Sequence, residues 1–148
     1  MTDRRTPYGV VHYGACRDDW PNLRLYDQPP AGGSPVKLQA SALRAFRAAE
    51  RRYAKLTGWS AQRIKRTGGR AIRLTGSWRS RAYQAQLYRR DPRRYAPPCS
   101  GLHPDGLAVD VSQDQPNLGK IDRVLKAEGW VQVRPSDEPW HYSYIVRG

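Results

Sequence analysis

The chain has 148 residues, a formal net charge of +13 at neutral pH and 39% hydrophobic residues. This length suits one domain with one core, and five tryptophans and nine tyrosines exclude an intrinsically disordered chain. No apolar run approaches the roughly 20 residues of a membrane span, and no apolar stretch follows the first basic residues as in a secretory signal. The excess of arginine favours anionic partners. Because no groove-reading or base-stacking motif accompanies it, we expect no specific nucleic-acid target.

The first 37 residues are rich in proline and glycine and show no sustained period. We therefore expect residues 1–37 to form an irregular wrap over the domain that residues 38–148 make. Apolar residues at helical spacing predict a helix over residues 38–56, and alternation predicts a strand over residues 71–75.

The middle of the chain is predicted to form a helix and then a long loop. The helix runs over residues 80–90 and ends before Pro92, because a residue that precedes proline is driven out of the helical conformation. Residues 91–104 contain four prolines and a glycine, which indicates a loop that delivers His103.

The last third of the chain alternates strand and helix signals. We expect a strand over residues 107–112, a helix over 118–128 that ends at Gly129, and strands over 130–134 and 140–146. The order of elements predicts an α+β fold, with a small, largely antiparallel sheet flanked by helices.

Two short segments carry the residues with metal chemistry. The first contains His103 and Asp110, and the second contains Glu138 and His141. A single histidine is more often a hydrogen-bonded core residue, but a carboxylate inside an apolar strand needs a cationic, backbone or metal partner. Two imidazoles and a carboxylate suit Zn²⁺ with a fourth position for water, and a nearby free carboxylate can accept a proton from that water. The sequence therefore predicts a hydrolytic site with one zinc ion per chain.

The two cysteines, Cys16 and Cys99, match no metal-finger spacing. Two readings stay open: buried free thiols, or one disulfide that ties the N-terminal segment to the site. Cys99 also lies four residues before His103, close enough in sequence to be a metal neighbour.

The segment SGLHPDGLAVD, with His103 and Asp110, followed about thirty residues later by EPWH, with Glu138 and His141, resembles the zinc D-alanyl-D-alanine peptidase family. This is the M15 group of peptidoglycan peptidases, which is related to lysostaphin-type enzymes and to the hedgehog signalling domain. An upstream block, SWRS and then Gln84, is similar to the family's Ser-Gly-Tyr-Arg-Ser segment and the glutamine that follows it. The resemblance covers roughly residues 36–146.

The resemblance implies a role for each matching position. His103, Asp110 and His141 would bind zinc, and Glu138 would be the general base and acid. Arg79 would anchor a substrate carboxylate or stabilise the oxyanion, since its planar guanidinium can bind a carboxylate through two hydrogen bonds.

Gln84 and Trp78 are further candidates for substrate binding. The chain departs from the family's pattern at two positions: Gly101 stands where the family has serine, with Ser100 one residue earlier, and Trp78 stands where the family has tyrosine.

These observations predict a zinc metallopeptidase that hydrolyses an amide bond in peptidoglycan stem peptides, as a D,D-carboxypeptidase or as an L-alanyl-D-glutamate type of endopeptidase. Its basic surface would bind anionic wall polymers. We expect a protein made in the cytoplasm that acts on the cell wall: a phage endolysin, a virion-carried enzyme or a bacterial enzyme whose leader was removed. We expect a monomer unless it belongs to a virion assembly. The alternative is a non-catalytic zinc-containing domain of the same fold that binds cell wall or protein.

Overall fold

A four-stranded antiparallel sheet lies at the centre of the computed structural model, which describes residues 3–6, 9–12, 23–26, 33–97, 103 and 106–145. The strand order is β5-β6-β8-β7. The bounds of these strands are β5 Leu74–Gly76, β6 Ala108–Val111, β7 Trp130–Val131 and β8 His141–Tyr144. Together with the four helices of the described chain, this sheet confirms the predicted α+β class.

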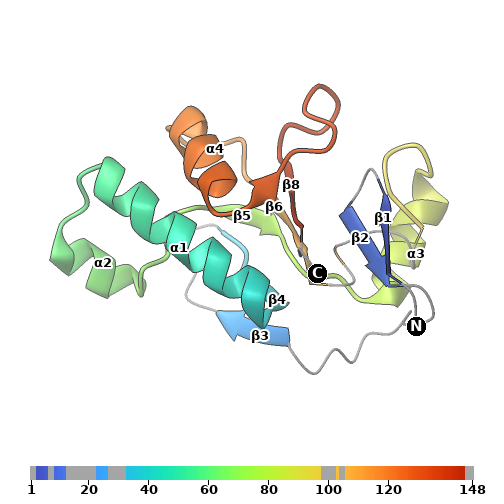
Figure 1. The fold of residues 1–148 in the computed structure, drawn as a ribbon, viewed down its shortest axis with the longest axis horizontal. Coiled ribbons are helices and arrows are strands. Elements are labelled where there is room, and N and C mark those ends of the chain that lie inside the picture. Colours follow the sequence, from blue (N-terminus) through green and yellow to red (C-terminus); the bar gives the residue numbers. More distant parts are fainter. Residues whose placement is uncertain are drawn as a thin grey trace.

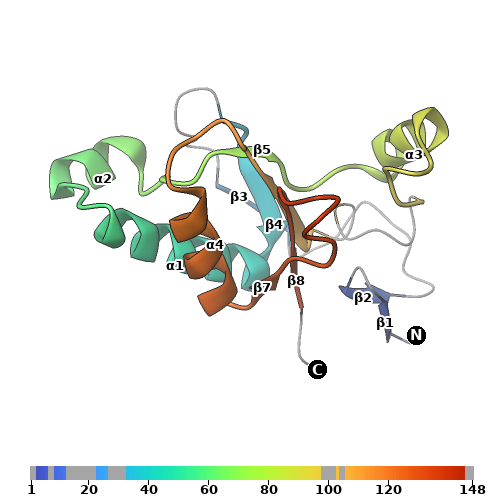
Figure 2. The same cartoon turned by 90° about the horizontal axis from the view of Figure 1, so that it is seen from above.

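The helices of the described chain are α1 Ala40–Leu56, α2 Ala61–Thr67, α3 Arg81–Arg90 and α4 Leu118–Ala127. In both views of the ribbon, α1, α2 and α4 lie on one side of the sheet and α3 on the other (Figure 1, Figure 2). α1 packs against α4, and Phe46 of α1 meets the ring of Trp130 edge-on, with 6.2 Å between the ring centroids. The core thus lies between the sheet and the α1–α4 pair, which leaves the side toward α3 for the site. No helix among the described residues is long and apolar enough to cross a membrane.

The predicted helices over residues 80–90 and 118–128 are confirmed as α3 and α4. Ser80 caps α3 through its hydroxyl, which accepts the backbone N–H of Tyr83 at 3.1 Å. α4 ends just before Gly129, whose φ of 92° lies in the left-handed region that favours glycine.

The start of α1 corrects the prediction for residues 38–56. Leu38 belongs to a strand, β4 (Val36–Gln39), which pairs with β3 (Leu23–Tyr26), and the helix begins at Ala40. Val36 and Leu38 are fully buried at alternate positions of β4. The spacing of Leu38 from the next apolar residues fits a helix as well, so periodicity alone placed the boundary two residues early.

The prediction that residues 1–37 are irregular throughout is wrong. They contain β3, and β1 (Asp3–Thr6) pairs with β2 (Gly9–His12) as an antiparallel hairpin. β1 reads DRRT, which has no apolar alternation to reveal a strand. The division into a wrap and a catalytic domain stays a prediction, and Cys16, Cys99, Ser100 and Gly101 lie outside the described residues.

The strand predicted over residues 71–75 begins later, as β5. The backbone N–H groups of Ala71 and Ile72 donate to the carboxylate of Glu50, at 2.8 and 3.1 Å, and that of Arg73 donates to the side chain of Gln115 at 2.9 Å. Side-chain acceptors therefore take the backbone N–H groups of these three residues in place of a neighbouring strand.

The last two strands are shorter than predicted, because a tight turn occupies the segment between them. The N–H of Glu138 donates to the carbonyl of Arg134 at 2.7 Å, so the chain from Arg134 onward turns instead of extending β7. β8 begins at His141, one residue later than expected, and ends at Tyr144.

α2 was not predicted. None of its residues is buried, so it has no apolar period, and only its ends carry a signal. The hydroxyl of Ser60 accepts the N–H of Arg63, and Gly68 closes the helix with a φ of 64°.

Candidate metal centre

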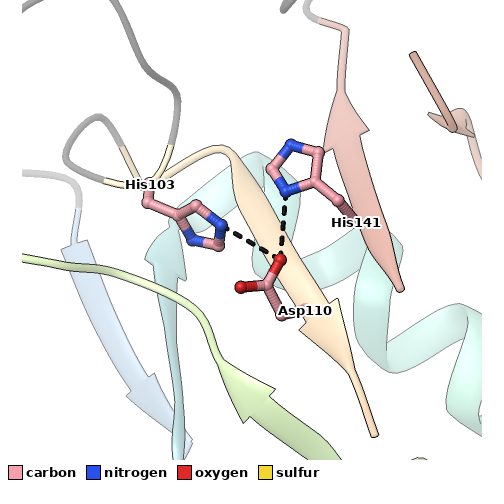
Figure 3. Close-up of side chains that lie close together, drawn as sticks. All are labelled: His103, Asp110 and His141. Carbon is pink, nitrogen blue, oxygen red and sulfur yellow. Dashed lines mark hydrogen bonds and ion pairs between the residues drawn. The ribbon is translucent and has the colours of Figure 1, made fainter. Parts of the chain in front are cut away.

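β6 and β8 place two of the predicted ligands side by side. Asp110 and His141 are direct partners in the antiparallel register, so their side chains stand on the same face of the sheet. His103 reaches them from a turn in which the N–H of Gly106 donates to the His103 carbonyl at 3.1 Å. Gly106 has a φ of 70°, which explains a glycine three residues after this histidine. The predicted ligands therefore converge from a turn and two neighbouring strands (Figure 3).

The three ligand atoms form a compact group. Oδ1 of Asp110 lies 3.2 Å from Nε2 of His103 and 3.0 Å from Nδ1 of His141, and all three atoms lie within 4.8 Å of one another. Zinc bonds of about 2.0–2.2 Å in tetrahedral geometry separate neighbouring ligand atoms by roughly 3.3 Å. The group thus has the size and the donor types of a zinc site that keeps one position open.

The outer nitrogen of His103 fixes its tautomer. Nδ1 lies 2.6 Å from the backbone carbonyl oxygen of Ser77. A carbonyl only accepts, so Nδ1 carries the proton and Nε2 presents its lone pair to Asp110 in the neutral ring. Burial is the largest influence on the pKa of His103 and lowers it below 6.5, which favours this neutral ring.

His141 is held in a comparable way. Its Nε2 lies 3.1 Å from Oγ of Ser143, a fully buried residue on the same face of β8. The hydroxyl oxygen of Ser143 can accept a hydrogen bond from Nε2–H, and Nδ1 then carries the lone pair of the neutral ring. In that arrangement two imidazole lone pairs and a carboxylate converge with no hydrogen between them, which a divalent cation satisfies.

Asp110 is anionic despite its burial. Burial alone would raise its pKa, but the neighbouring imidazoles of His103 and His141 hold that pKa well below its usual range. The carboxylate is thus a ready anionic ligand at neutral pH.

Arg79 contacts the metal-ligand group through the second oxygen of Asp110, the one that does not face the histidines. Nη2 donates to Oδ2 of Asp110 at 2.7 Å, and Nη1 donates to Oε1 of Gln84 at 3.3 Å. Gln84 is buried and donates its amide N–H to the carbonyl of Ala96 at 2.8 Å, which links α3 to the loop that follows it. Two of the five guanidinium N–H groups of Arg79 are used in these contacts, so donors remain for a bound molecule.

The structure brings Glu138 to the same place. A cavity of about 440 Å³ is lined by all three ligand residues, Arg79, Gln84 and Glu138. Among the described residues, no side chain forms an ion pair or hydrogen bond with the half-buried Glu138 carboxylate. An unengaged carboxylate beside a three-ligand group is the arrangement that the sequence predicted for a general base.

Trp78 lies elsewhere. The backbone N–H of Trp78 donates to the backbone carbonyl of Lys37 at 3.1 Å, and the Lys37 ammonium lies 4.4 Å from the centre of the Trp78 ring. Trp78 is not among the residues that line the cavity within the described part of the chain. Its role in substrate binding, like that of Gln84, stays a prediction.

The loop after α3 is the part of the site that the sequence reasoning missed. Arg93, Arg94 and Tyr95 line the cavity, as does Trp140, which precedes His141. The run of two arginines and a tyrosine that begins three residues after the end of α3 was the available signal, whereas the prediction for this loop was only that it delivers His103.

The fold and the metal-ligand group together define an α+β domain with a candidate metal site in one cavity. No protein-family model and no curated protein matches the sequence. A solved structure with a similar fold is a variant of the vancomycin-resistance D,D-pentapeptidase VanY from a VanB-type resistance cassette, in complex with Zn(II). The sequences are 16% identical, and the TM-score is 0.54 over 84% of this chain and 79% of that one. The chain therefore shares the fold of VanY.

Proposed function

We propose that the protein is a zinc peptidase that hydrolyses an amide bond of peptidoglycan stem peptides. The convergence of two imidazole nitrogens and a carboxylate in one cavity with Glu138 carries this proposal. The VanY-like fold supports it, since that relative is a D,D-pentapeptidase in complex with Zn(II).

His103, Asp110 and His141 would hold the ion. Zinc, when bound there, supplies Lewis acidity that polarises an amide carbonyl and makes water more acidic. Everything else in the reaction falls to the side chains of the cavity.

Glu138 would move the protons. Its carboxylate accepts a proton from the attacking water and returns it to the nitrogen of the leaving amine. The same residue serves both steps because it has no competing partner among the described residues.

Arg79 would bind negative charge with its remaining N–H groups. The charge is a substrate carboxylate or the oxygen of the reacting carbonyl. The contacts with Asp110 and Gln84 hold the guanidinium in one orientation, so little side-chain entropy is lost when it binds. If Arg79 binds the C-terminal carboxylate of the substrate, the enzyme is a D,D-carboxypeptidase. If the substrate peptide continues past Arg79, the enzyme is an endopeptidase.

The test is mass spectrometry of peptidoglycan of several chemotypes after incubation with the zinc-loaded protein, with and without a chelator. We expect a chelator-sensitive product: free D-alanine for a carboxypeptidase, or a cut elsewhere in the stem for an endopeptidase. Absence of any product from protein that holds one zinc ion would instead support a non-catalytic binding domain.

A pair of variants separates catalysis from folding. Glu138→Ala should lower the rate of hydrolysis by about 10²–10⁴-fold, while zinc stays bound. Asp137→Ala, a change to the exposed neighbouring acid that pairs with Arg134, should leave both properties intact. An active, zinc-loaded Glu138→Ala protein would contradict the role of Glu138.

A further inference from the structure

The cavity that holds the metal-ligand group is rich in arginine. It is lined by four arginines and two carboxylates, which are Arg79, Arg93, Arg94, Arg134, Asp110 and Glu138. The proposed reaction uses both carboxylates and one of the arginines. The other cations call for a separate explanation, because uncompensated positive charge along a cavity attracts an anionic ligand.

The arginines differ in what they already contact. Arg79 is paired with Asp110, and Arg134 lies 3.4 Å from the carboxylate of Asp137. Arg93 and Arg94, on the loop after α3, form no ion pair with any residue of the described chain. These two residues therefore carry the available positive charge of the cavity wall.

Aromatic rings hold Arg94 in position without neutralising it. Its guanidinium carbon lies 5.5 Å from the ring centre of Tyr95 and 5.6 Å from that of Trp140. Both distances are within the range of cation–π contacts. Since Trp140 directly precedes His141, these contacts connect the loop to the strand that carries a metal ligand.

Tyr95 also lies next to Arg79. The guanidinium carbon of Arg79 is 5.8 Å from the centre of the Tyr95 ring, so the cations of Arg79 and Arg94 both approach one ring. The two guanidinium carbons therefore lie at most about 11 Å apart. An extended peptide advances roughly 3.3–3.6 Å per residue, so about three residues span that distance. One short peptide can therefore contact both arginines.

We propose that Arg93 and Arg94 form a second anion subsite, which binds a carboxylate of the substrate peptide other than the group that Arg79 faces. This inference rests on the proposed function and specifies its substrate: an acidic stem peptide with a free carboxylate within about three residues of the group at Arg79. Amidation of that carboxylate removes the charge that the subsite binds. Arg94 provides the fixed contact, and Arg93 adds positive charge beside it.

The experiment compares synthetic stem peptides in which each internal carboxylate is amidated in turn. For the zinc-loaded protein we expect kcat/KM to fall about tenfold when one particular carboxylate becomes an amide, the size of effect that one charge-assisted contact gives. Arg94→Gln should lower kcat/KM for the free-carboxylate peptide by a similar factor and leave the amidated peptide unchanged. Arg94→Lys keeps the charge but loses the planar contact with the rings. Its kcat/KM for the free-carboxylate peptide should lie between the values of the wild type and of Arg94→Gln.

Arg89→Gln is the matched control. It removes the same charge from the exposed end of α3, at a residue that does not line the cavity, and should preserve the preference for the free carboxylate. If Arg89→Gln and Arg94→Gln lower kcat/KM for the free-carboxylate peptide equally, the effect comes from the net charge of the protein, and the subsite is overturned.

The outcomes separate this inference from the proposed function. Hydrolysis of all peptides at one rate would overturn the subsite and leave the peptidase intact. If no peptide is hydrolysed, the proposed function fails, and calorimetric titration of the same peptides decides the subsite. Binding that depends on one carboxylate and on Arg94 would support it, whereas equal binding of all peptides, or none, would overturn it.

Discussion

Two arginine–carboxylate pairs among the described residues have largely buried side chains, and one of the two lies beside the cavity. Glu50 and Arg70 pair between α1 and the start of β5, at 3.0 Å and with side chains at most 1% exposed. Asp110 and Arg79 pair at 2.7 Å beside the metal-ligand group. Burial of charge is common to both, so it does not identify the site by itself.

The partners of the two carboxylates make the difference. Glu50 accepts N–H groups from Arg70, Ala71 and Ile72, all of which keep their protons at any physiological pH. Asp110 faces ring nitrogens of His103 and His141 that can present lone pairs, so the three groups can bind a cation together. The pKa of the two acids moves in opposite directions: burial raises that of Glu50, whereas the two histidines lower that of Asp110 despite its burial. The first pair stabilises the fold, and the second belongs to the group proposed to hold zinc.

The largest effect is expected from Asp110→Asn. The amide removes the anionic ligand, so zinc content should fall to near zero and hydrolysis of stem peptides by about 10³-fold or more. Metal analysis and product quantification check this. Asp122→Asn is the control, because that carboxylate accepts the hydroxyl of Tyr142 away from the cavity. A zinc-loaded and active Asp110→Asn protein would contradict the ligand assignment.

Glu50→Gln should act on stability alone. It leaves Arg70 buried without its counter-charge, which costs about 3–5 kcal/mol of unfolding free energy. Urea unfolding of the metal-free protein measures the loss, and zinc affinity of the folded protein should not change. Glu128→Gln, which breaks the exposed pair with Arg52, should cost less than about 1 kcal/mol. Loss of zinc affinity in folded Glu50→Gln would make the two regions one coupled unit.

Ser143→Ala tests the outer contact of His141. Without an acceptor for Nε2–H the ring orientation is no longer fixed, and we expect zinc affinity to drop about 10–100-fold. Competition against a chelator gives the affinity. Ser112→Ala removes a comparably buried hydroxyl that accepts the N–H of Asp114 instead, and should leave zinc affinity unchanged.

The smallest effect is a pH dependence of the metal-free protein. Burial holds the pKa of His103 below 6.5, so at mildly acidic pH this residue binds a proton more readily in the unfolded chain than in the folded protein. The free energy of unfolding therefore falls as the pH drops below about 6.5. The slope is at most about 1.4 kcal/mol per pH unit for one group. The lowered pKa of Asp110 adds stability above about pH 3.9, which is lost only at lower pH.

Urea unfolding at pH 7.0 and pH 5.5 measures this dependence. The raised pKa of Glu50 contributes in the opposite sense, but equally to wild type and to His103→Asn, so the difference between the two proteins isolates His103. An equal change with pH in both proteins would contradict the assignment.

The sequence by itself determined the fold class, α3, α4 and the residue types of the metal-ligand group. Alternation around Asp110 predicted the strand that carries it, and the two histidine segments predicted the ligand types. These features depend on local periodicity and on residue identity, which a chain carries whatever its neighbours are.

Only the tertiary structure decided the strand register, the limits of β5 and the charge of the cavity. Residues 71–73 alternate like a strand, but Glu50 and Gln115 take their N–H groups, and both acceptors come from distant parts of the chain. The register that pairs Asp110 with His141, and the position of Arg94 between Tyr95 and Trp140, likewise join segments about 30 to 45 residues apart. Such contacts form only when the core fixes the elements relative to one another, so no local pattern reports them.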